Sequence, residues 1–155
     1  MAGTIVADQL EAASTSTLVI KNGVASTPPT IQDSAGTQIG TFCRAFVNFN
    51  GATVTSPASM TGVNGSFNVS SVLDNGTGDY TINFTTAMPD ANYATLATCV
   101  QNANASSTNR SIGVYVSTGG AETSTSVLVG SVRVQIMASS STKLDQNPVN
   151  VAIFR

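Results

Sequence analysis

The chain has 155 residues, of which 9% are charged and 41% are hydrophobic, and its net charge at pH 7 is -2. This apolar content argues against a disordered chain, which combines low hydrophobicity with high net charge. Lysine and arginine number six in all and stand singly, so we expect no nucleic-acid binding, which needs clustered cations. The apolar runs fall short of the roughly 18 residues that a membrane helix needs, so we expect no membrane insertion.

The first forty residues differ from the rest of the chain in their pattern of apolar residues, which occur in short separate segments. Short apolar segments occur at Gly3–Asp8, Thr17–Lys21 and Ile31–Thr37, and Pro28-Pro29 forces an extended path between the last two. Segments this short bury too little surface alone. We therefore expect an extended N-terminal arm over residues 1–40, which packs against other chains. An arm folded back on its own domain is the alternative.

From Gly40 onward the pattern is that of a β-domain, residues 41–155. Apolar and polar residues alternate in short runs that are separated by turns rich in Gly, Asn and Ser, a spacing typical of an antiparallel β-sandwich. The segment Gly51–Asn64 has little patterning and is predicted to be a loop. We expect strands near Cys43–Asn48, Ser66–Leu73, Asp79–Thr86, Ala94–Gln101, Ser111–Ser117, Ser126–Arg133, Val134–Met137 and Val149–Phe154.

The clearest local prediction is a β-hairpin formed by Ser66–Leu73 and Asp79–Thr86. The turn between these strands, DNGTG, has the Asp, Asn and Gly residues that a tight reversal favours. Period-two alternation places one face of each strand on a core. The side chains predicted to point inward are Phe67, Val69, Ile82 and Phe84.

The same region carries a resemblance. The runs CRAFVNFNG and SFNVSSVLDNGTGDYTINFTTAMPDANY, within Cys43–Tyr93, resemble the C-terminal domain of bacteriophage tail-fibre proteins, especially fibres of cyanobacterial phages. The resemblance implies a knob-like homotrimer on the virion tail, assembled in the host cytoplasm. Its arm would bind a tail or baseplate protein, and its β-domain would touch a host-surface glycan or protein. Because no long shaft separates these parts, a capsid decoration or cement protein stays open as the alternative.

The resemblance also assigns roles to apolar residues of the arm. Their short strands need partners to be buried, and in a fibre those partners are the sister chains or the virion protein that holds the arm. The candidate attachment and trimer-contact residues are Ile5, Val6, Leu18, Ile20 and Ile31.

Catalytic chemistry finds little support in the residue types present. The chain has no histidine, which excludes Ser-His and Cys-His nucleophile pairs. Asp74 and Asp79 flank the hairpin turn, and turn formation explains them better than acid–base work or a Ca²⁺ loop. We expect Cys43 and Cys99 to be free thiols, because the N-terminal residues do not form a secretion signal and disulfides are rare in reducing compartments. We therefore predict that the protein is not an enzyme and that it binds no metal or cofactor.

Receptor binding is predicted on polar loops of the β-domain. The loops Asn102–Arg110, Thr118–Thr125 and Ser139–Asn147 are long and rich in Asn, Ser and Thr, which suit hydrogen bonding to glycan hydroxyls. The alternative is that they are polar only because loops are exposed. The candidate receptor-binding residues are Asn102, Asn104, Asn109 and Arg110, with Tyr93 as an aromatic contact that could equally belong to the core.

Overall fold

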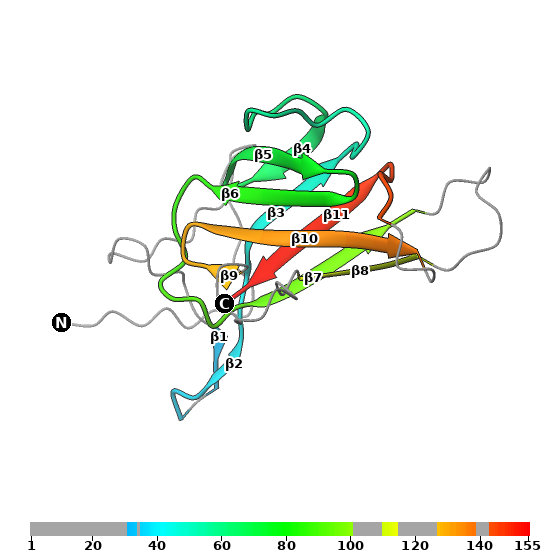
Figure 1. The fold of residues 1–155 in the computed structure, drawn as a ribbon. Coiled ribbons are helices and arrows are strands. Elements are labelled where there is room, and N and C mark those ends of the chain that lie inside the picture. Colours follow the sequence, from blue (N-terminus) through cyan, green and yellow to red (C-terminus); the bar gives the residue numbers. More distant parts are fainter. Residues whose placement is uncertain (1–30, 34, 101–109, 115–126, 139–142) are drawn as a thin grey trace, which may run out of the picture.

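In the computed structural model, the described residues are 31–33, 35–100, 110–114, 127–138 and 143–155, and their regular structure is entirely β (Figure 1). Two antiparallel sheets face each other. The first has the strand order β4-β3-β11-β7, and the second has the order β5-β6-β10-β8 with β9 paired to β10. The predicted antiparallel β-sandwich is confirmed. The described part contains no helix that could span a membrane.

The strands of the first sheet are β3 (Cys43–Phe49), β4 (Val63–Phe67), β7 (Ala94–Cys99) and β11 (Val149–Phe154). Those of the second are β5 (Val69–Gly76), β6 (Asp79–Phe84), β8 (Arg110–Val114), β9 (Val127–Leu128) and β10 (Ser131–Ala138). A separate small sheet pairs β1 (Ile31–Gln32) with β2 (Gln38–Gly40).

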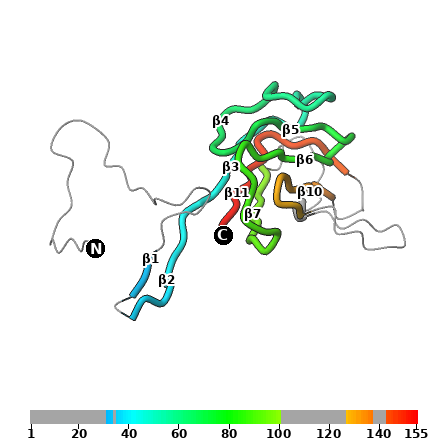
Figure 2. The backbone as a smooth tube through the Cα atoms, turned by 90° about the vertical axis from the view of Figure 1, so that its left-hand side faces the viewer, coloured from blue at the N-terminus to red at the C-terminus, as the bar shows by residue number. Residues whose placement is uncertain are grey.

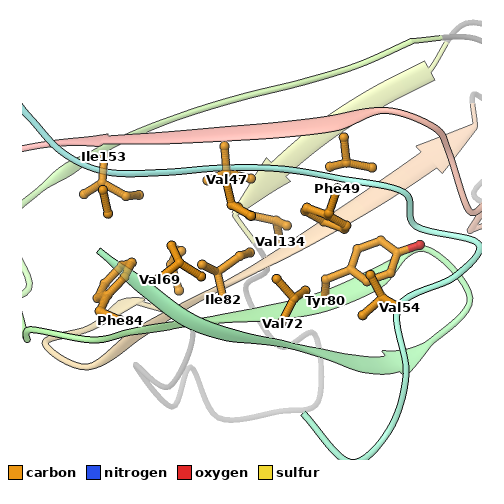
Figure 3. Packing of buried hydrophobic residues seen from close by; sticks show 14 of the residues in the cluster. Val47, Phe49, Val54, Val69, Val72, Tyr80, Ile82, Phe84, Val134 and Ile153 are labelled. Carbon is orange, nitrogen blue, oxygen red and sulfur yellow. The ribbon is translucent and has the colours of Figure 1, made fainter. Parts of the chain in front are cut away.

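The core lies between the two sheets (Figure 3). On β3 and β11 every second residue is buried, which gives Val47, Phe49, Val151 and Ile153 to the core. The facing sheet contributes apolar residues of β5, β6 and β10, and Phe49 meets Tyr80 edge to face at 5.0 Å between ring centroids. On β3 and β11 burial therefore follows the period-two alternation of strands that have one face on the core. The fully buried apolar residues of the second sheet include Val72, Tyr80, Ile82, Val132, Val134 and Ile136.

The predicted strand Ser66–Leu73 is divided between the two sheets. Asn68 has a positive φ of 54°, which breaks the extended path, and β4 ends before it while β5 begins after it. Its side-chain nitrogen donates to the carbonyl oxygens of Arg44 and Thr86, and its side-chain oxygen accepts from the Thr86 amide at 2.7 Å. Asn68 thus fixes the point at which the chain crosses from one sheet to the other.

This crossing corrects one predicted core residue. Val69, Ile82 and Phe84 are buried as predicted, but Phe67 is 56% exposed. Phe67 and Val69 have the same parity and would share one face of an unbroken strand. Because the chain changes sheets at Asn68, Phe67 instead lies on the outer face of β4.

Other predicted boundaries also shift. The hairpin of β5 and β6 is confirmed, with Gly76 and Gly78 at positive φ in its turn. The expected strand Ser126–Arg133 is wrong, because the chain turns at Val129-Gly130 and β9 folds back on β10, pairing Leu128 with Ser131. The predicted loop over residues 51–64 ends in the first two residues of β4.

Truncation of two phenylalanines tests the face assignment. Phe84 is 8% exposed and Phe67 is 56% exposed, so Phe84→Ala is expected to lower the free energy of unfolding by about 3–5 kcal/mol and Phe67→Ala by less than about 1 kcal/mol. Denaturant unfolding of both variants gives the comparison. Equal losses would show that both rings face the core.

Candidate functional site

Large apolar side chains form a row across the outer face of the first sheet. Phe67 of β4 lies opposite Phe46 of β3, which lies opposite Ala152 of β11, and Ala152 lies opposite Leu96 of β7. Phe46, Phe67 and Leu96 are 44%, 56% and 57% exposed, and the two phenyl rings stack with their centroids 6.4 Å apart. These four residues are called the apolar row below.

A polar row runs beside the apolar row, across the same four strands. Asn64 donates a side-chain hydrogen bond to the side-chain oxygen of Asn48 at 2.7 Å. Asn48 donates in turn to the side-chain oxygen of Asn150, and Asn150 donates to the Thr98 hydroxyl at 3.3 Å. Asn64, Asn48, Asn150 and Thr98 are called the amide row. Each bond orients the next amide, so the row has a fixed direction across the sheet.

The amide row keeps hydrogen-bonding capacity for a ligand. An asparagine amide has two N–H donors and an oxygen with two lone pairs. Within the row, Asn48 and Asn150 each donate one bond and accept one. Each therefore has a second donor and a second acceptor site on a sheet face that is open to solvent.

The two rows border a hollow of about 230 Å³. Ala152 lies between Phe46 and Leu96 in the strand order, so its small side chain forms the floor and the two larger side chains form the sides. The amide row forms one end, through Asn48, Thr98 and Asn150. None of the described residues that line the hollow carries a charge. The site is therefore amphipathic and uncharged.

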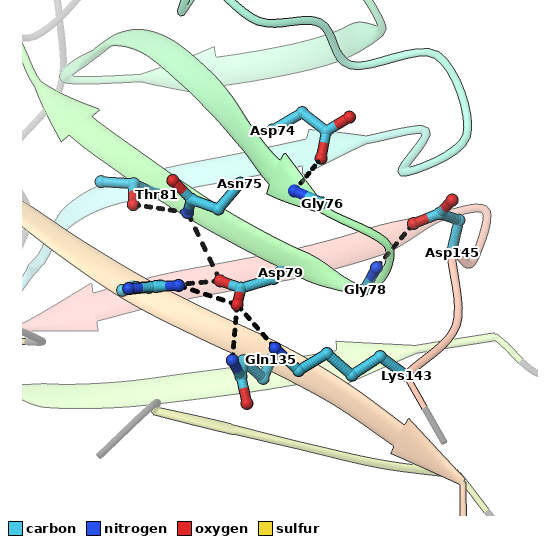
Figure 4. A network of polar contacts seen from close by, with 10 residues as sticks. Asp74, Asn75, Gly76, Gly78, Asp79, Thr81, Gln135, Lys143 and Asp145 are labelled. Atoms are coloured by element: carbon cyan, nitrogen blue, oxygen red, sulfur yellow. Dashed lines mark hydrogen bonds and ion pairs between the residues drawn. The ribbon is translucent and has the colours of Figure 1, made fainter. Parts of the chain in front are cut away.

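A second polar cluster surrounds Asp79 at the start of β6 (Figure 4). Its side chain is 3% exposed and receives both an Nε–H bond at 2.7 Å and an Nη2–H bond at 2.9 Å from Arg133. Lys143 Nζ lies 2.9 Å from the same carboxylate, and Gln135 donates to it as well. Asp79 is a buried ion-pair centre rather than only a turn residue.

The environment of Asp79 lowers its pKa strongly. Burial alone would raise the pKa, but the hydrogen bonds from Arg133, Lys143 and Gln135 outweigh it and lower the pKa of Asp79 to about 2. A carboxylate that is ionised and held by these hydrogen bonds is a poor proton donor or acceptor near neutral pH. The cluster therefore holds β6, β10 and the segment after β10 together.

Asp145 supports the same hairpin from the other side. Its carboxylate accepts a hydrogen bond from the Gly78 amide at 2.7 Å and from the Tyr80 hydroxyl at 2.6 Å. Burial, followed by this bond, raises the pKa of Tyr80 above its ordinary value. A Cβ on Gly51 would come within 2.4 Å of the Tyr80 hydroxyl, so only glycine fits there.

The loop residues predicted to bind a receptor are described only in part. Asn102, Asn104 and Asn109 lie outside the described residues, as does the loop Thr118–Thr125, and the backbone of Arg110 begins β8. Tyr93 is half-buried. Its ring meets Phe84 edge to face at 5.9 Å, and its hydroxyl donates toward the Leu128 and Ser131 carbonyl oxygens at 3.0 and 2.9 Å. These bonds fix the Tyr93 hydroxyl at the turn between β9 and β10.

The arm residues and cysteines are placed as follows. Ile31 lies on β1 and is 44% exposed, whereas Ile5, Val6, Leu18 and Ile20 lie outside the described residues. Cys43 and Cys99 form no disulfide with each other. They lie opposite Phe154 and Val149, at opposite ends of β11. This separation is far beyond the reach of a disulfide bond.

Sequence interpretation missed the residues of the two rows, although a signal was present. In CRAFVNF the inward positions are Ala45, Val47 and Phe49, so a phenylalanine at Phe46 breaks the alternation on the solvent side. An exposed aromatic side chain beside asparagines is a typical feature of a binding surface. The pairing of β3 with β11 and β7 was needed to show that these residues meet.

No protein-family model matches the chain, and no curated protein sequence matches it. Among solved structures, the chain is similar to the phiAB6 tailspike, crystallised with three-repeated oligosaccharides of Acinetobacter baumannii surface polysaccharide, with a TM-score of 0.45 and 15% identity. The match covers 90% of this chain and 31% of the tailspike chain. This is a weak likeness to a phage tailspike, and the resemblance to cyanophage fibres stays a prediction.

The Asp79 cluster generates a prediction about pH. A lowered pKa means that the stabilisation is fully present above the unfolded value of about 3.9 and is lost as the pH falls through about 2. The wild type is expected to lose about 2 kcal/mol of unfolding free energy over this interval, and Asp79→Asn is expected to lack this component. At pH 7, Asp79→Asn is expected to cost about 3 kcal/mol, because the buried ion pairs of Asp79 with Arg133 and Lys143 are broken.

Urea unfolding from pH 5 to pH 2 measures this dependence, and Asp90→Asn is the control. Asp90 pairs with Arg155 at 2.6 Å, but both side chains are about 40% exposed, so its loss should change stability little. The assignment is contradicted if Asp79→Asn and the wild type have parallel pH profiles.

Proposed function

We propose that the protein is a structural component of a phage virion, associated with the tail, which is held by its N-terminal arm and presents the β-sandwich to the host-cell surface. The resemblance of Cys43–Tyr93 to phage tail fibres supports this proposal. The observation that carries it is the exposed apolar hairpin formed by β1 and β2. The proposed role is assembly and binding, without catalysis.

The hairpin of β1 and β2 projects from the domain beyond the start of β3, on the side away from β10 (Figure 2). Its turn is held locally, since the Asp33 carboxylate accepts hydrogen bonds from the Ala35 and Thr37 amides at 2.9 Å. Ile31 and Ile39 are nevertheless 44% and 65% exposed. An isolated two-stranded hairpin is marginal in water, so this one is suited to burial against another protein.

The connection to the domain fits an anchoring role. Phe42 follows β2 and is 43% exposed, and the neighbouring Thr41 hydroxyl donates a hydrogen bond to the Arg155 carbonyl oxygen at 2.7 Å. The exposed apolar residues of β1, β2 and this junction lie within twelve positions of the sequence, 31–42. We propose that they contact sister chains of a homotrimer and the tail or baseplate protein, together with the arm residues that precede them.

A charge placed on the arm tests this assignment. Ile39→Lys is expected to leave the unfolding midpoint of the domain unchanged, because the side chain is already exposed, and to abolish incorporation into particles. Thr37→Lys adds the same charge to the same hairpin at an exposed polar position and should be incorporated normally. Quantitative immunoblotting of purified particles, with gold labelling in electron micrographs, measures both copy number and position. Equal incorporation of the two variants would place the anchor elsewhere, and labels on the head would support a cement protein instead.

A further inference from the structure

We propose that the hollow between the apolar row and the amide row binds an uncharged sugar unit of a cell-surface oligosaccharide. This inference rests on the proposed host-contact role and names a site and a ligand class for it. The site lies on strands β3, β7 and β11 and does not include the polar loops that the sequence pointed to.

The chemistry of the hollow matches that of a sugar ring. A pyranose has apolar C–H faces and a rim of hydroxyl groups, each of which donates and accepts. Phe46 and Leu96 offer exposed apolar surface on either side of Ala152, against which a ring face can pack. Asn48 and Asn150 offer the remaining donors and acceptors of their amides at one end of the same hollow. Two neighbouring hydroxyl groups of the sugar can each accept a hydrogen bond from an amide N–H and donate one to an amide oxygen.

The uncharged lining of the hollow favours neutral sugars over acidic ones. No described lining residue is a lysine or arginine, whereas recognition of a carboxylate or phosphate ordinarily uses such a cation. The protein as a whole carries a net charge of -2, which disfavours an anionic partner further. Electrostatic complementarity therefore favours a neutral sugar over an acidic one.

The size of the hollow fits one unit of a longer chain. Its volume of about 230 Å³ is below the roughly 300–1,000 Å³ of pockets that enclose a drug-sized ligand. Phe67 extends the apolar row past Phe46, stacked on it with the ring planes 26° apart. The neighbouring unit of an oligosaccharide can therefore continue over Phe46 and Phe67.

A second copy of the chain is the competing occupant of this face, and the amide row disfavours it. An apolar partner surface would bury the spare donors and acceptors of Asn48 and Asn150 without hydrogen bonds, which is costly. Stable protein interfaces also bury roughly 800 Å² on each partner, far more than three partly exposed side chains supply. The apolar residues of the β1–β2 hairpin are the better candidates for contact between copies.

Filling the hollow tests the proposal. Ala152→Leu adds a side chain to the floor without removing any group that contacts the ligand, and Leu96→Ala removes one side. Ala94→Leu is the matched control, because Ala94 is an exposed residue of β7 on the same face and outside the hollow. The probes are an array of neutral oligosaccharides, composed of hexoses and 6-deoxyhexoses, and uronic-acid-containing oligosaccharides, followed by titration calorimetry with those that bind.

We expect the wild-type chain to retain neutral oligosaccharides in preference to the acidic ones. Ala152→Leu and Leu96→Ala should each weaken binding by about tenfold or more, and Ala94→Leu by less than about twofold. Three results would overturn the proposal: retention of no oligosaccharide, preference for acidic ones, or binding that Ala152→Leu leaves unchanged. Sedimentation of the same variants can give a fourth contrary result. If Ala152→Leu alone reduces the size of the oligomer, the face binds a second copy of the chain. None of these results alters the expected behaviour of Ile39→Lys, so the two proposals fail separately.

Discussion

The crossing at Asn68 is the constraint on which the arrangement of this protein depends. A single asparagine with φ at 54° ends β4 and starts β5 in the opposite sheet. Its amide also binds the backbone of Arg44 and Thr86, which lie far from each other in sequence. Asparagine tolerates the left-handed region better than most residues and provides these bonds as well. Without the crossing, Phe67 and Val69 would share one face, and neither the core nor the outer aromatic pair would form as it does.

The β5–β6 hairpin follows this crossing. Two carboxylates, those of Asp79 and Asp145, bind it to the rest of the domain. Asp79 is surrounded by Arg133, Gln135 and Lys143, and Asp145 binds Gly78 and Tyr80. These contacts connect β6 with β10 and with the segment before β11, so they fix the hairpin relative to both sheets. Asp79 and Asp145 thus stand where strands of the described part must be positioned relative to one another.

The candidate site is a product of strand pairing between distant segments. Phe46 and Asn48 lie near the start of the domain, Leu96 and Thr98 lie fifty residues later, and Asn150 and Ala152 lie near the end of the chain. Antiparallel pairing of β11 with both β3 and β7 brings the three pairs into two parallel rows. The inner positions of these strands form the core, so the rows stand on a rigid support, as precise binding requires. No described residue of the β1–β2 hairpin lines the hollow between the two rows.

The sequence by itself determined the fold class, the β5–β6 hairpin and the inward positions of Val69, Ile82 and Phe84, because period-two alternation and turn residues are local properties. It also indicated the exposed apolar character of Ile31. Only the tertiary structure decided the division of Ser66–Leu73 between two sheets, the outward position of Phe67 and the burial of Asp79. Each of these depends on contacts with residues remote in the chain, such as Thr86, Phe46 and Arg133. A local pattern specifies which residues alternate, but strand order and register specify which of them meet.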